Sequence, residues 1–424
     1  MSASIPLPIE LLLKGILPFM SLKELGILSR TSREIYRFVH LAYVPLIVKD
    51  EYSTELLGAT NMDHLEMLNY LTTEQIRLAC GENHIVWVDS KNNISFWNPD
   101  GYKIFPALNP KEKIVAVTCG TSHTVFLTMN MEPFSFGDNS HGQLGVGDHE
   151  PRKNPTKIIM KEKIGRIASN ASCTTFLTSK THELFMCGFF PTKIGSLDFV
   201  NQHTPKHIPV KSLEKNEFIK DMCIGGRHFL ISTNMHRLFS VGERDCIGRY
   251  TRDTQEFGLV DSRNFPRKTS ILKISSGYSH SLVLFGNGAV FCFGKSANGE
   301  LGLARFQDSP IPQQIPDLPP AISIFAGKQH SVVIAAAPKT KLFTFGLATH
   351  GQLGYTCSFW SSCQPRECQL PDKSHLLNLA AAGAQFTVFA NPLTKNLVIF
   401  GDFGSDGSQF YYSKKISTIE LAIQ

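Results

Sequence analysis

The stretch Ile274-Ser-Ser-Gly277-Tyr-Ser-His280-Ser-Leu-Val-Leu284, which leads on to Phe293-Gly294, decides the fold because its pattern recurs along the chain. The pattern consists of an apolar run, a Gly-x-x-His step, a second apolar run and an aromatic residue followed by glycine. The same order is found in Val117–Leu127, which leads to Phe136-Gly137. Self-similarity of this kind predicts an array of structural repeats.

The repeat has a nearly constant period. The residues equivalent to His280 follow one another at intervals of 39 to 56 residues, which divides the chain from about residue 76 onward into seven units. From this position to the residue after the aromatic one, the distance is 14 to 16 residues in every unit. The centre of the unit therefore keeps its length while its connections vary. The seven equivalent residues are His84, His123, Cys173, His228, His280, His330 and Phe386.

Each unit contains two or three short alternating runs rich in Val, Ile and Phe, which is typical of antiparallel strands joined by tight turns. A unit of about fifty residues with such strands fits one blade of a β-propeller. We therefore expect a mainly β fold, with a seven-bladed propeller over residues 76–424. Turns such as Gly142-Gln-Leu-Gly145 require glycine at positive φ. The alternating run Ile416–Ile423 predicts a last strand that completes the final blade and helps to close the ring.

The order Gly-x-x-His, Phe-Gly and Gly-Gln-Leu-Gly resembles the regulator-of-chromosome-condensation repeat family, and the resemblance covers about 350 of the 424 residues. It implies a seven-bladed propeller. Four units depart from the pattern: Trp97-Asn98 lacks the glycine, Val241-Gly242 lacks the aromatic residue, and Cys173 and Phe386 replace the histidine. Kelch propellers differ, because they carry a double glycine in each blade, and Gly225-Gly226 is the one example here.

The repeat histidines follow equivalent glycine turns, so radial symmetry is expected to place them as a ring on one face. The resemblance implies that this face is where the nucleotide-exchange member of the family engages its small GTPase. The candidate substrate face therefore consists of His84, His123, His228, His280 and His330. The alternative is that each histidine bonds backbone within its own blade.

Residues 5–41 lack strand-like alternation and indicate three short helices. Pro8 stands where a helix can begin, Ser21 with Glu24 forms a capping box for a second helix, and Ser32 opens a third. A bundle this small cannot bury all of its apolar residues, so it requires a partner surface.

This N-terminal segment resembles the F-box, a three-helix motif that binds the adaptor subunit of cullin-based ubiquitin ligases. The resemblance implies an F-box over residues 1–41 and a helical connector over residues 42–75. The alternative is a helical cap that packs on its own protein. The adaptor-binding residues implied by the resemblance are Leu7, Pro8, Ile9, Leu11, Leu12, Ile16, Leu17, Leu25, Leu28, Ser29 and Tyr36.

The net charge of +6 is mild for a chain of 424 residues and does not favour a nucleic-acid partner. Basic residues are concentrated between residues 151 and 166, where Glu162 is the one acidic residue. This stretch is a candidate docking patch for an acidic partner segment, and the alternative is a solvated loop between blades. Its basic residues are Arg152, Lys153, Lys157, Lys161, Lys163 and Arg166.

The sequence contains no pattern that predicts catalysis, a metal site or a cofactor. Gly294-Lys295-Ser296 looks like the end of a phosphate-binding loop, but an alanine stands at the first glycine position of that motif. Cys357, Cys363, Cys368 and His375 lack the Cys-x-x-Cys spacing of a zinc site.

Two features bear on the compartment. The ten cysteines are scattered through apolar runs, which indicates reduced thiols and a cytoplasmic or nuclear protein. Residues 5–22 carry charges and prolines that a signal peptide lacks, and no stretch is long and apolar enough to predict a membrane span.

The combination predicts a non-catalytic substrate-recognition subunit of an SCF-type ubiquitin ligase. The F-box would bind the adaptor, and through it a cullin, while the propeller would hold a protein substrate near the conjugating enzyme. Irregular connections on a rigid scaffold often carry recognition, which points to Phe189–Glu217 and Glu243–Thr269. The first alternative is a guanine-nucleotide exchange factor or chromatin-associated regulator that acts through the propeller face. The second is an interaction scaffold.

Overall fold

The structure is a computed structural model of the chain. The chain divides into two units at residue 76, and every described residue lies in the second unit, Arg77–Gln424. The expected F-box and its connector, with all adaptor-binding residues, therefore lie outside the described residues. The structure describes residues 78–88, 92–98, 101–105, 113–195, 197–198, 200–267, 269–337, 339–357, 359–368, 379–391, 396–401 and 416–420.

The described residues form seven four-stranded antiparallel sheets, or blades, each built from strands that are consecutive in sequence. Blade 1 consists of β1 (Leu78–Cys80), β2 (Ile85–Val88), β3 (Ile94–Asn98) and β4 (Gly101–Phe105). Blade 2 consists of β5 (Ile114–Cys119), β6 (His123–Thr128), β7 (Pro133–Gly137) and β8 (Arg152–Lys157). Blade 3 consists of β9 (Ile164–Asn170), β10 (Cys173–Thr178), β11 (Leu184–Gly188) and β12 (Gln202–Ile208).

The other four blades repeat this order. Blade 4 consists of β13 (Ile219–Ile224), β14 (His228–Thr233), β15 (Leu238–Gly242) and β16 (Gly258–Leu259), with a 3-10 turn, η5 (Arg244–Cys246), before β16. Blade 5 consists of β17 (Ile271–Ser276), β18 (His280–Phe285), β19 (Val290–Gly294) and β20 (Ser309–Gln314). Blade 6 consists of β21 (Ala321–Ala326), β22 (His330–Ala337), β23 (Lys339–Leu347) and β24 (Ser361–Cys368). Blade 7 consists of β25 (Leu379–Ala382), β26 (Phe386–Asn391), β27 (Asn396–Gly401) and β28 (Ile416–Glu420).

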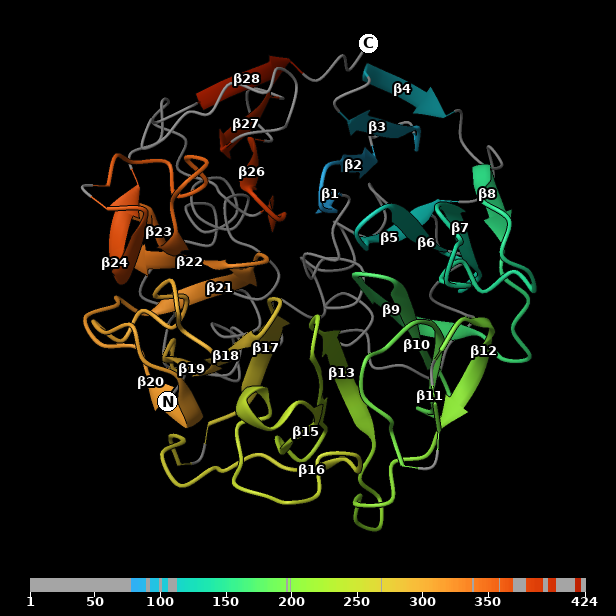
Figure 1. The fold of residues 1–424 in the computed structure, drawn as a ribbon, viewed down its shortest axis with the longest axis horizontal. Helices are drawn as coiled ribbons and strands as arrows, with labels where there is room; N and C mark the ends of the chain where they lie inside the picture. Colours follow the sequence, from blue (N-terminus) through green and yellow to red (C-terminus); the bar gives the residue numbers. More distant parts are fainter. Residues whose placement is uncertain are drawn as a thin grey trace, which may run out of the picture. The chain divides into compact units, whose positions relative to one another are not determined.

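Figure 1 shows the blades arranged radially, with the first strand of each blade innermost and the fourth outermost. Strand β1 contacts β25, so blade 7 meets blade 1 and the ring closes. Strand β28 pairs with β27, which confirms that the C-terminal run completes the last blade. The seven-bladed propeller expected from the repeat is thus confirmed.

The two ends of the ring are not equivalent. Successive strands run in opposite directions, so the turn after the first strand and the connection after the third strand lie at the same end of each blade. We call this end the loop face. Its described residues are 81–84, 120–122, 171–172, 225–227, 277–279, 327–329 and 383–385 in the turns, and 138–151, 189–195, 197–198, 200–201, 243–257, 295–308, 348–357 and 359–360 in the connections.

Phenylalanine fills the spaces between and within blades. Among the described residues, the largest fully buried side chains are all phenylalanines. Phe126 and Phe136, on β6 and β7, stack at 5.6 Å between ring centroids, and Phe96 of blade 1 packs against Phe136 at 5.7 Å. Because a flat ring buries a large apolar area with few rotatable bonds, it suits the narrow gap between two sheets. This use explains why phenylalanine is so frequent among the buried residues of the blades.

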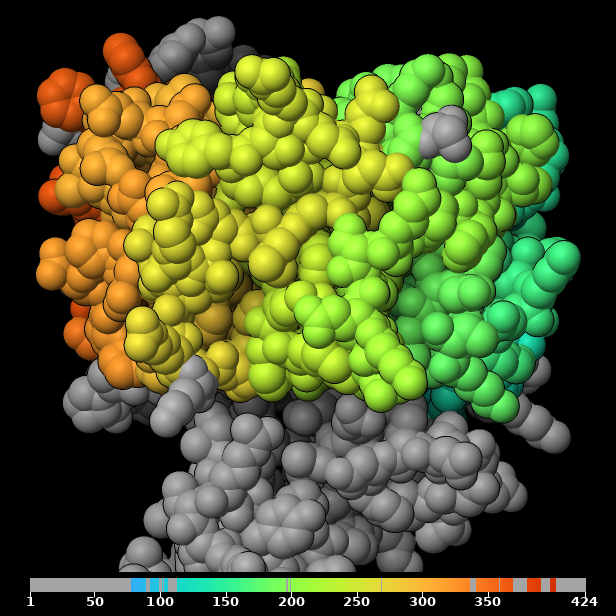
Figure 2. Space-filling model, turned by 90° about the horizontal axis from the view of Figure 1, so that it is seen from below, coloured from blue at the N-terminus to red at the C-terminus, as the bar shows by residue number. Residues whose placement is uncertain are grey.

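Four of the seven outermost strands carry prolines. Pro155 lies in β8, Pro205 in β12, Pro310 and Pro312 in β20, and Pro365 in β24. A proline cannot donate a backbone hydrogen bond, so it prevents a further strand from pairing with that edge. Figure 2 looks onto this outer wall, where segments from green to orange follow one another around the ring.

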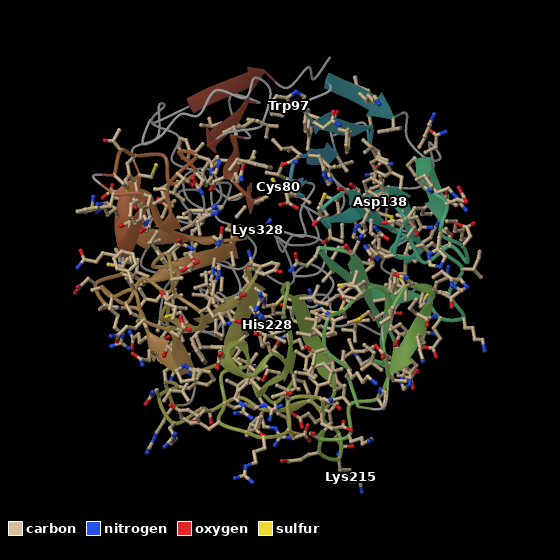
Figure 3. All side chains as sticks on the ribbon, viewed as in Figure 1. Cys80, Trp97, Asp138, Lys215, His228 and Lys328 are labelled. Carbon is tan, nitrogen blue, oxygen red and sulfur yellow. The ribbon has the colours of Figure 1, made fainter. Side chains whose placement is uncertain are left out.

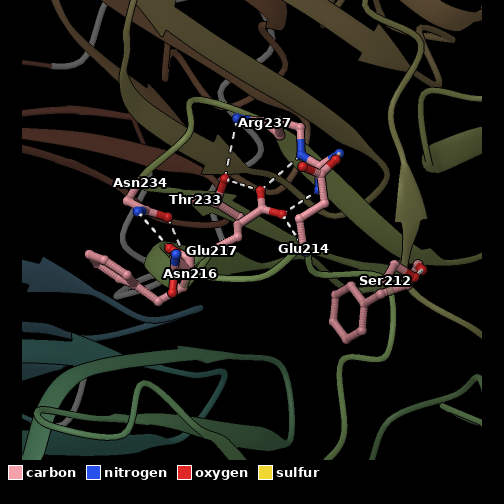
Figure 4. A network of polar contacts seen from close by, with 9 residues as sticks. Ser212, Glu214, Asn216, Glu217, Thr233, Asn234 and Arg237 are labelled. Carbon is pink, nitrogen blue, oxygen red and sulfur yellow. Dashed lines mark hydrogen bonds and ion pairs between the residues drawn. The ribbon is translucent and has the colours of Figure 1, made fainter.

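A buried ion pair joins the start and the middle of blade 4 (Figure 4). Glu217 precedes β13 and Arg237 lies between β14 and β15, at the end of the ring opposite the loop face. The Glu217 side chain has no exposed surface, and its carboxylate accepts hydrogen bonds from Arg237 Nε at 2.9 Å, Thr233 Oγ1 at 2.6 Å and the Glu214 backbone N–H at 3.0 Å. Arg237 is the main cause that lowers the pKa of Glu217 to about 2. The carboxylate is thus charged and dependent on its partner.

Replacing Arg237 with Met is expected to lower the free energy of unfolding by about 3 kcal/mol, because it leaves the Glu217 carboxylate buried without its ion pair. Urea denaturation at pH 7 measures this loss. The matched control is Lys211→Met, because the Lys211–Glu256 pair is 71% and 36% exposed and should contribute less than about 1 kcal/mol. Equal losses in the two variants would show that the pair in blade 4 contributes no more than a surface contact.

Candidate protein-binding face

The Gly-x-x-His step is a turn in which the imidazole folds back onto its own glycine. A Cβ atom added to Gly277 would lie 2.2 Å from Cε1 of His280 and 2.4 Å from the carbonyl oxygen of Gly327 in the next blade. The glycine is therefore required by close approach. The Gly-Gln-Leu-Gly turns differ, because Gly142 and Gly145 have φ values of +79° and +68°, as the sequence predicted.

Each histidine ring bonds a hydroxyl group of the next blade. In three joints this hydroxyl also donates to a carbonyl oxygen, as Thr174 does to Gln143 at 2.8 Å, so its single proton is used and the imidazole Nε2–H must be the donor. The Nε2–Oγ pairs are His84–Thr124 at 3.2 Å, His123–Thr174 at 2.9 Å, His228–Ser281 at 2.6 Å, His280–Ser331 at 2.9 Å and His330–Thr387 at 2.8 Å.

These contacts correct the expectation of a histidine face. The five histidines His84, His123, His228, His280 and His330 are between 0% and 5% exposed, so none presents a surface to a partner. They also bond side chains of the next blade rather than backbone of their own. Burial lowers the pKa of His84 and His280 to about 4 and that of the other three to about 3. At pH 7 the rings are neutral joints between blades.

The two joints without a histidine also lack the hydroxyl. Cys173 takes the histidine position of blade 3, and Phe229 stands at the hydroxyl position of blade 4. In blade 7, Phe386 takes the histidine position, and Ile85 stands at the hydroxyl position of blade 1. All four side chains are buried. Each joint is therefore either polar on both sides or apolar on both sides, which explains why the departures from the repeat do not interrupt the ring.

The basic stretch 151–166 does not form one patch. Its residues belong to β8, to β9 and to the connection between them, and Glu132 pairs with Lys157 at 2.7 Å and with Lys163 at 2.9 Å. Arg152 pairs with Asp148 at 2.5 Å, and Arg166 with Asp221 at 3.4 Å. Lys153 and Lys161 are exposed. Neighbouring acids thus balance most of this charge, which weakens the stretch as a docking patch for an acidic segment.

Aromatic side chains gather on the loop face. Among the described residues, every exposed Phe, Tyr or Trp side chain lies there, and Tyr250 and Phe359 are the most exposed at 72% and 71%. They come from blades 3 to 6. The six side chains are Phe189, Tyr250, Tyr278, Phe306, Phe359 and Trp360.

The connections of the loop face rest on strands of the neighbouring blades, which hold them rigidly. A Cβ atom on Gly299 would lie 2.5 Å from the Cα atom of Cys363 in β24, so the connection after β19, which carries Phe306, rests directly on the next blade. The Ala304 N–H also donates to the Cys363 carbonyl oxygen at 2.8 Å. Connections braced in this way present their aromatic side chains at defined positions, which lowers the entropy lost on binding.

The described residues contain no cluster of ligands that would hold a metal ion. All ten cysteines are free thiols, and burial raises the pKa of Cys119 to about 12, which disfavours the reactive thiolate. In the described part of the chain, no helix has the length and apolar character needed to cross a membrane.

Residues 134–177 and 287–334 match the family described as Regulator of chromosome condensation (RCC1) repeat, and residues 271–300 match a second family of the same description. The chain contains RCC1 repeats. These matches fall within blades 2, 3, 5 and 6 and do not reach the N-terminal segment, so the F-box stays a prediction.

Several curated proteins resemble the RCC1-repeat region. The Ultraviolet-B receptor UVR8 of Arabidopsis thaliana is 27% identical over 57% of this chain and 55% of its own length. A mouse RCC1-like G exchanging factor-like protein is 21% identical over 62% of each chain. The Regulator of chromosome condensation of Xenopus laevis is 26% identical over 75% of this chain and 82% of its own length. The match thus spans little more than half the length of the first two relatives.

Solved structures show the same fold. Prp20p of Saccharomyces cerevisiae, a protein studied for its binding to Gsp1p and histones, aligns with a TM-score of 0.63 at 19% identity and covers 74% of this chain and 81% of its own. Human WBSCR16 aligns with a TM-score of 0.61 at 20% identity over 74% of this chain and 86% of its own. At these identities the likeness shows the propeller fold alone.

The sequence missed the aromatic face, although a signal for it was present. Phe189 and Tyr250 lie in the two irregular connections that were expected to carry recognition, whereas Phe306, Phe359 and Trp360 lie in connections that follow the regular pattern. These last three residues occupy the variable part of their units. Aromatic residues outside the repeated positions were therefore the usable signal.

Proposed function

We propose that the propeller is a non-catalytic regulator that binds a small GTPase through its loop face and promotes nucleotide exchange. The gathering of all exposed aromatic side chains of the described residues on that face carries the proposal, because aromatic anchors supply much of the energy of protein interfaces. The names of relatives add support: an exchanging factor-like protein, a Ras guanine nucleotide exchange factor and a GTPase regulator.

Exchange requires no bond chemistry. A propeller that binds the nucleotide-free form of a GTPase more tightly than the nucleotide-bound form shifts the equilibrium toward release. A rigid face serves this purpose, because the binding energy is then available to distort the partner rather than the propeller. We expect Tyr250, Phe359 and Trp360 to be the principal anchors.

The test measures release of a fluorescent GDP analogue from a panel of small GTPases that includes Gsp1p, with and without the full chain. Phe359→Ala combined with Trp360→Ala is expected to slow release by about thirtyfold, the effect of losing one interface hot spot. Ile159→Ala is the control, because Ile159 is also exposed but lies at the opposite end of the ring. If the full chain accelerates no GTPase but binds histones, the chromatin-associated role replaces exchange.

A second candidate function rests on a separate observation, the F-box-like order of Leu7–Tyr36. In this role the N-terminal segment binds the adaptor of a cullin-based ubiquitin ligase and the same loop face binds a protein substrate. The chain would then raise the effective concentration of substrate lysines near the conjugating enzyme. Its place would be the cytoplasm or the nucleus.

Co-expression of the full chain with the ligase adaptor, followed by size exclusion, tests this role. We expect a stable complex that is lost when Leu11 and Leu12 are both replaced by Arg, because charges on an apolar binding helix prevent its burial. Ile159→Arg, an equally drastic change on the propeller, should leave the complex intact. A wild-type chain that does not bind the adaptor, or a Leu11 and Leu12 variant that still binds, would remove the ligase role.

A further inference from the structure

We infer that the mouth of the central channel binds a basic side chain of a protein partner, with the Glu82 carboxylate as its counter-ion. The inference deepens the proposed function and rests on the propeller binding a protein through its loop face. It names a second point of contact on that face, at the centre of the ring rather than among the aromatic connections.

The channel opens at the loop face into a cavity of about 200 Å³, lined by the first turn of six blades and by the end of the first strand of blade 4. The space exists because much of the wall consists of small residues such as Gly120, Ala171 and Ala384. Backbone hydrogen bonds join neighbouring turns around the rim, as from the Glu82 N–H to the Thr121 carbonyl at 3.2 Å. The cavity is therefore preformed, and it has the size to admit one long side chain.

Two charged side chains stand at this mouth, Glu82 from blade 1 and Lys328 from blade 6. Their carboxylate and ammonium groups form an ion pair that joins blade 1 to blade 6 and residues 246 positions apart. Figure 3 places Lys328 close to the centre of the ring. The Glu82 carboxylate at this mouth therefore already pairs with a lysine ammonium group, which the protein itself supplies.

The same geometry indicates which of the two charges a partner replaces. The Lys328 side chain is the more exposed, 41% against 31% for Glu82, and its flexible four-carbon stem lets the ammonium group swing into solvent. The Glu82 side chain is the less exposed of the two and has fewer rotatable bonds. We therefore expect an incoming cation to displace Lys328 and pair with the Glu82 carboxylate, rather than an incoming anion to displace Glu82.

A further group of the lining favours a cation. Tyr278 contributes an aromatic ring that already attracts the Arg227 guanidinium, 5.4 Å from the ring centroid.

Isothermal titration calorimetry of the full chain with Nα-acetyl-lysine methylamide tests the site without any protein partner. Lys328→Met should raise the association constant by about tenfold or more, because it removes the internal competitor. Glu82→Gln in the same background should abolish binding, because it keeps the shape of the side chain and removes its charge. Nα-acetyl-norleucine methylamide, an uncharged analogue of the probe, should not bind.

The control variant is Lys341→Met, which removes the lysine of a comparable ion pair with Glu367 on the outer part of blade 6. It should leave the titration unchanged. The inference is overturned if the lysine probe binds wild type and Lys328→Met equally well. It is also overturned if the probe does not bind Lys328→Met. Binding of Nα-acetyl-glutamate methylamide that appears in Glu82→Gln overturns it as well, since the site would then take carboxylates. None of these outcomes affects the nucleotide-release test, so the two proposals fail separately.

Discussion

Lowering the pH from 7 to 5 is expected to destabilise the propeller by several kcal/mol. The five joint histidines have pKa values of about 3 to 4 in the folded chain and about 6.5 once unfolded. The unfolded chain therefore binds more protons below pH 6.5, so stability falls with the pH until it reaches the folded pKa values. Each histidine contributes a loss of about 2 kcal/mol at pH 5.

The structure explains why the rings resist protonation. In the joints of His123, His280 and His330 the Nε2–H already donates to the hydroxyl of the next blade, so a second proton would sit on Nδ1. In His123, His228 and His330 this nitrogen is buried and has no hydrogen-bond partner among the described residues. A charge there would be desolvated and unpaired. The loss of about 2 kcal/mol per histidine, summed over five histidines, gives roughly 10 kcal/mol as an upper limit. This is comparable to the whole free energy of unfolding of a typical domain.

Urea denaturation followed by circular dichroism between pH 7 and pH 5 measures this dependence. The matched variant is His280→Phe with Ser331→Ile, which converts one polar joint into the apolar kind formed by Phe386 and Ile85. Its free energy of unfolding should depend on pH about one fifth less steeply than that of the wild type, whatever its stability at pH 7. A wild-type stability that does not change between pH 6.5 and pH 5 would contradict neutral, buried joints.

Gly188→Ala is expected to lower the free energy of unfolding by about 3 kcal/mol. Gly188 follows the aromatic position of blade 3 with a φ of +95°, a conformation that costs an L-residue about 1 to 2 kcal/mol. The added Cβ would also lie 2.2 Å from the Ser172 carbonyl oxygen and 3.1 Å from the Gln143 Cα atom. Both neighbours are backbone atoms in braced turns, so the collision adds a further cost of about 1 to 3 kcal/mol.

Gly147→Ala separates the two causes. Gly147 has nearly the same φ, +100°, but a Cβ atom there would meet nothing within 4 Å. We therefore expect the Gly147 variant to lose about 1 kcal/mol, from backbone strain alone. Thermal and urea denaturation of both variants at pH 7 provide the comparison. Similar losses in the two would mean that the turn of blade 3 moves to make room, and that glycine is needed there for its φ only.

The sequence by itself determined the number of blades, their order and the position of their turns. These follow from local physics: a strand has a short hydrophobic period, a tight turn needs glycine, and a unit of constant length repeats the same hairpins. The departures at Cys173 and Phe386 did not disturb the prediction, because the alternating runs around them are intact.

Only the tertiary structure decided which side chains face a partner. Whether a histidine points outward or into a joint depends on the hydroxyl across the joint, 40 to 57 residues away along the chain. The basic stretch loses most of its charge to Glu132, Asp148 and Asp221, and two of these lie far from it in sequence. The Glu82–Lys328 pair joins the first and sixth blades. These two residues come to lie at the same channel mouth only when the ring closes. Such contacts are set by the packing of whole blades, and a sequence pattern carries no information about which distant residues the closed ring brings together.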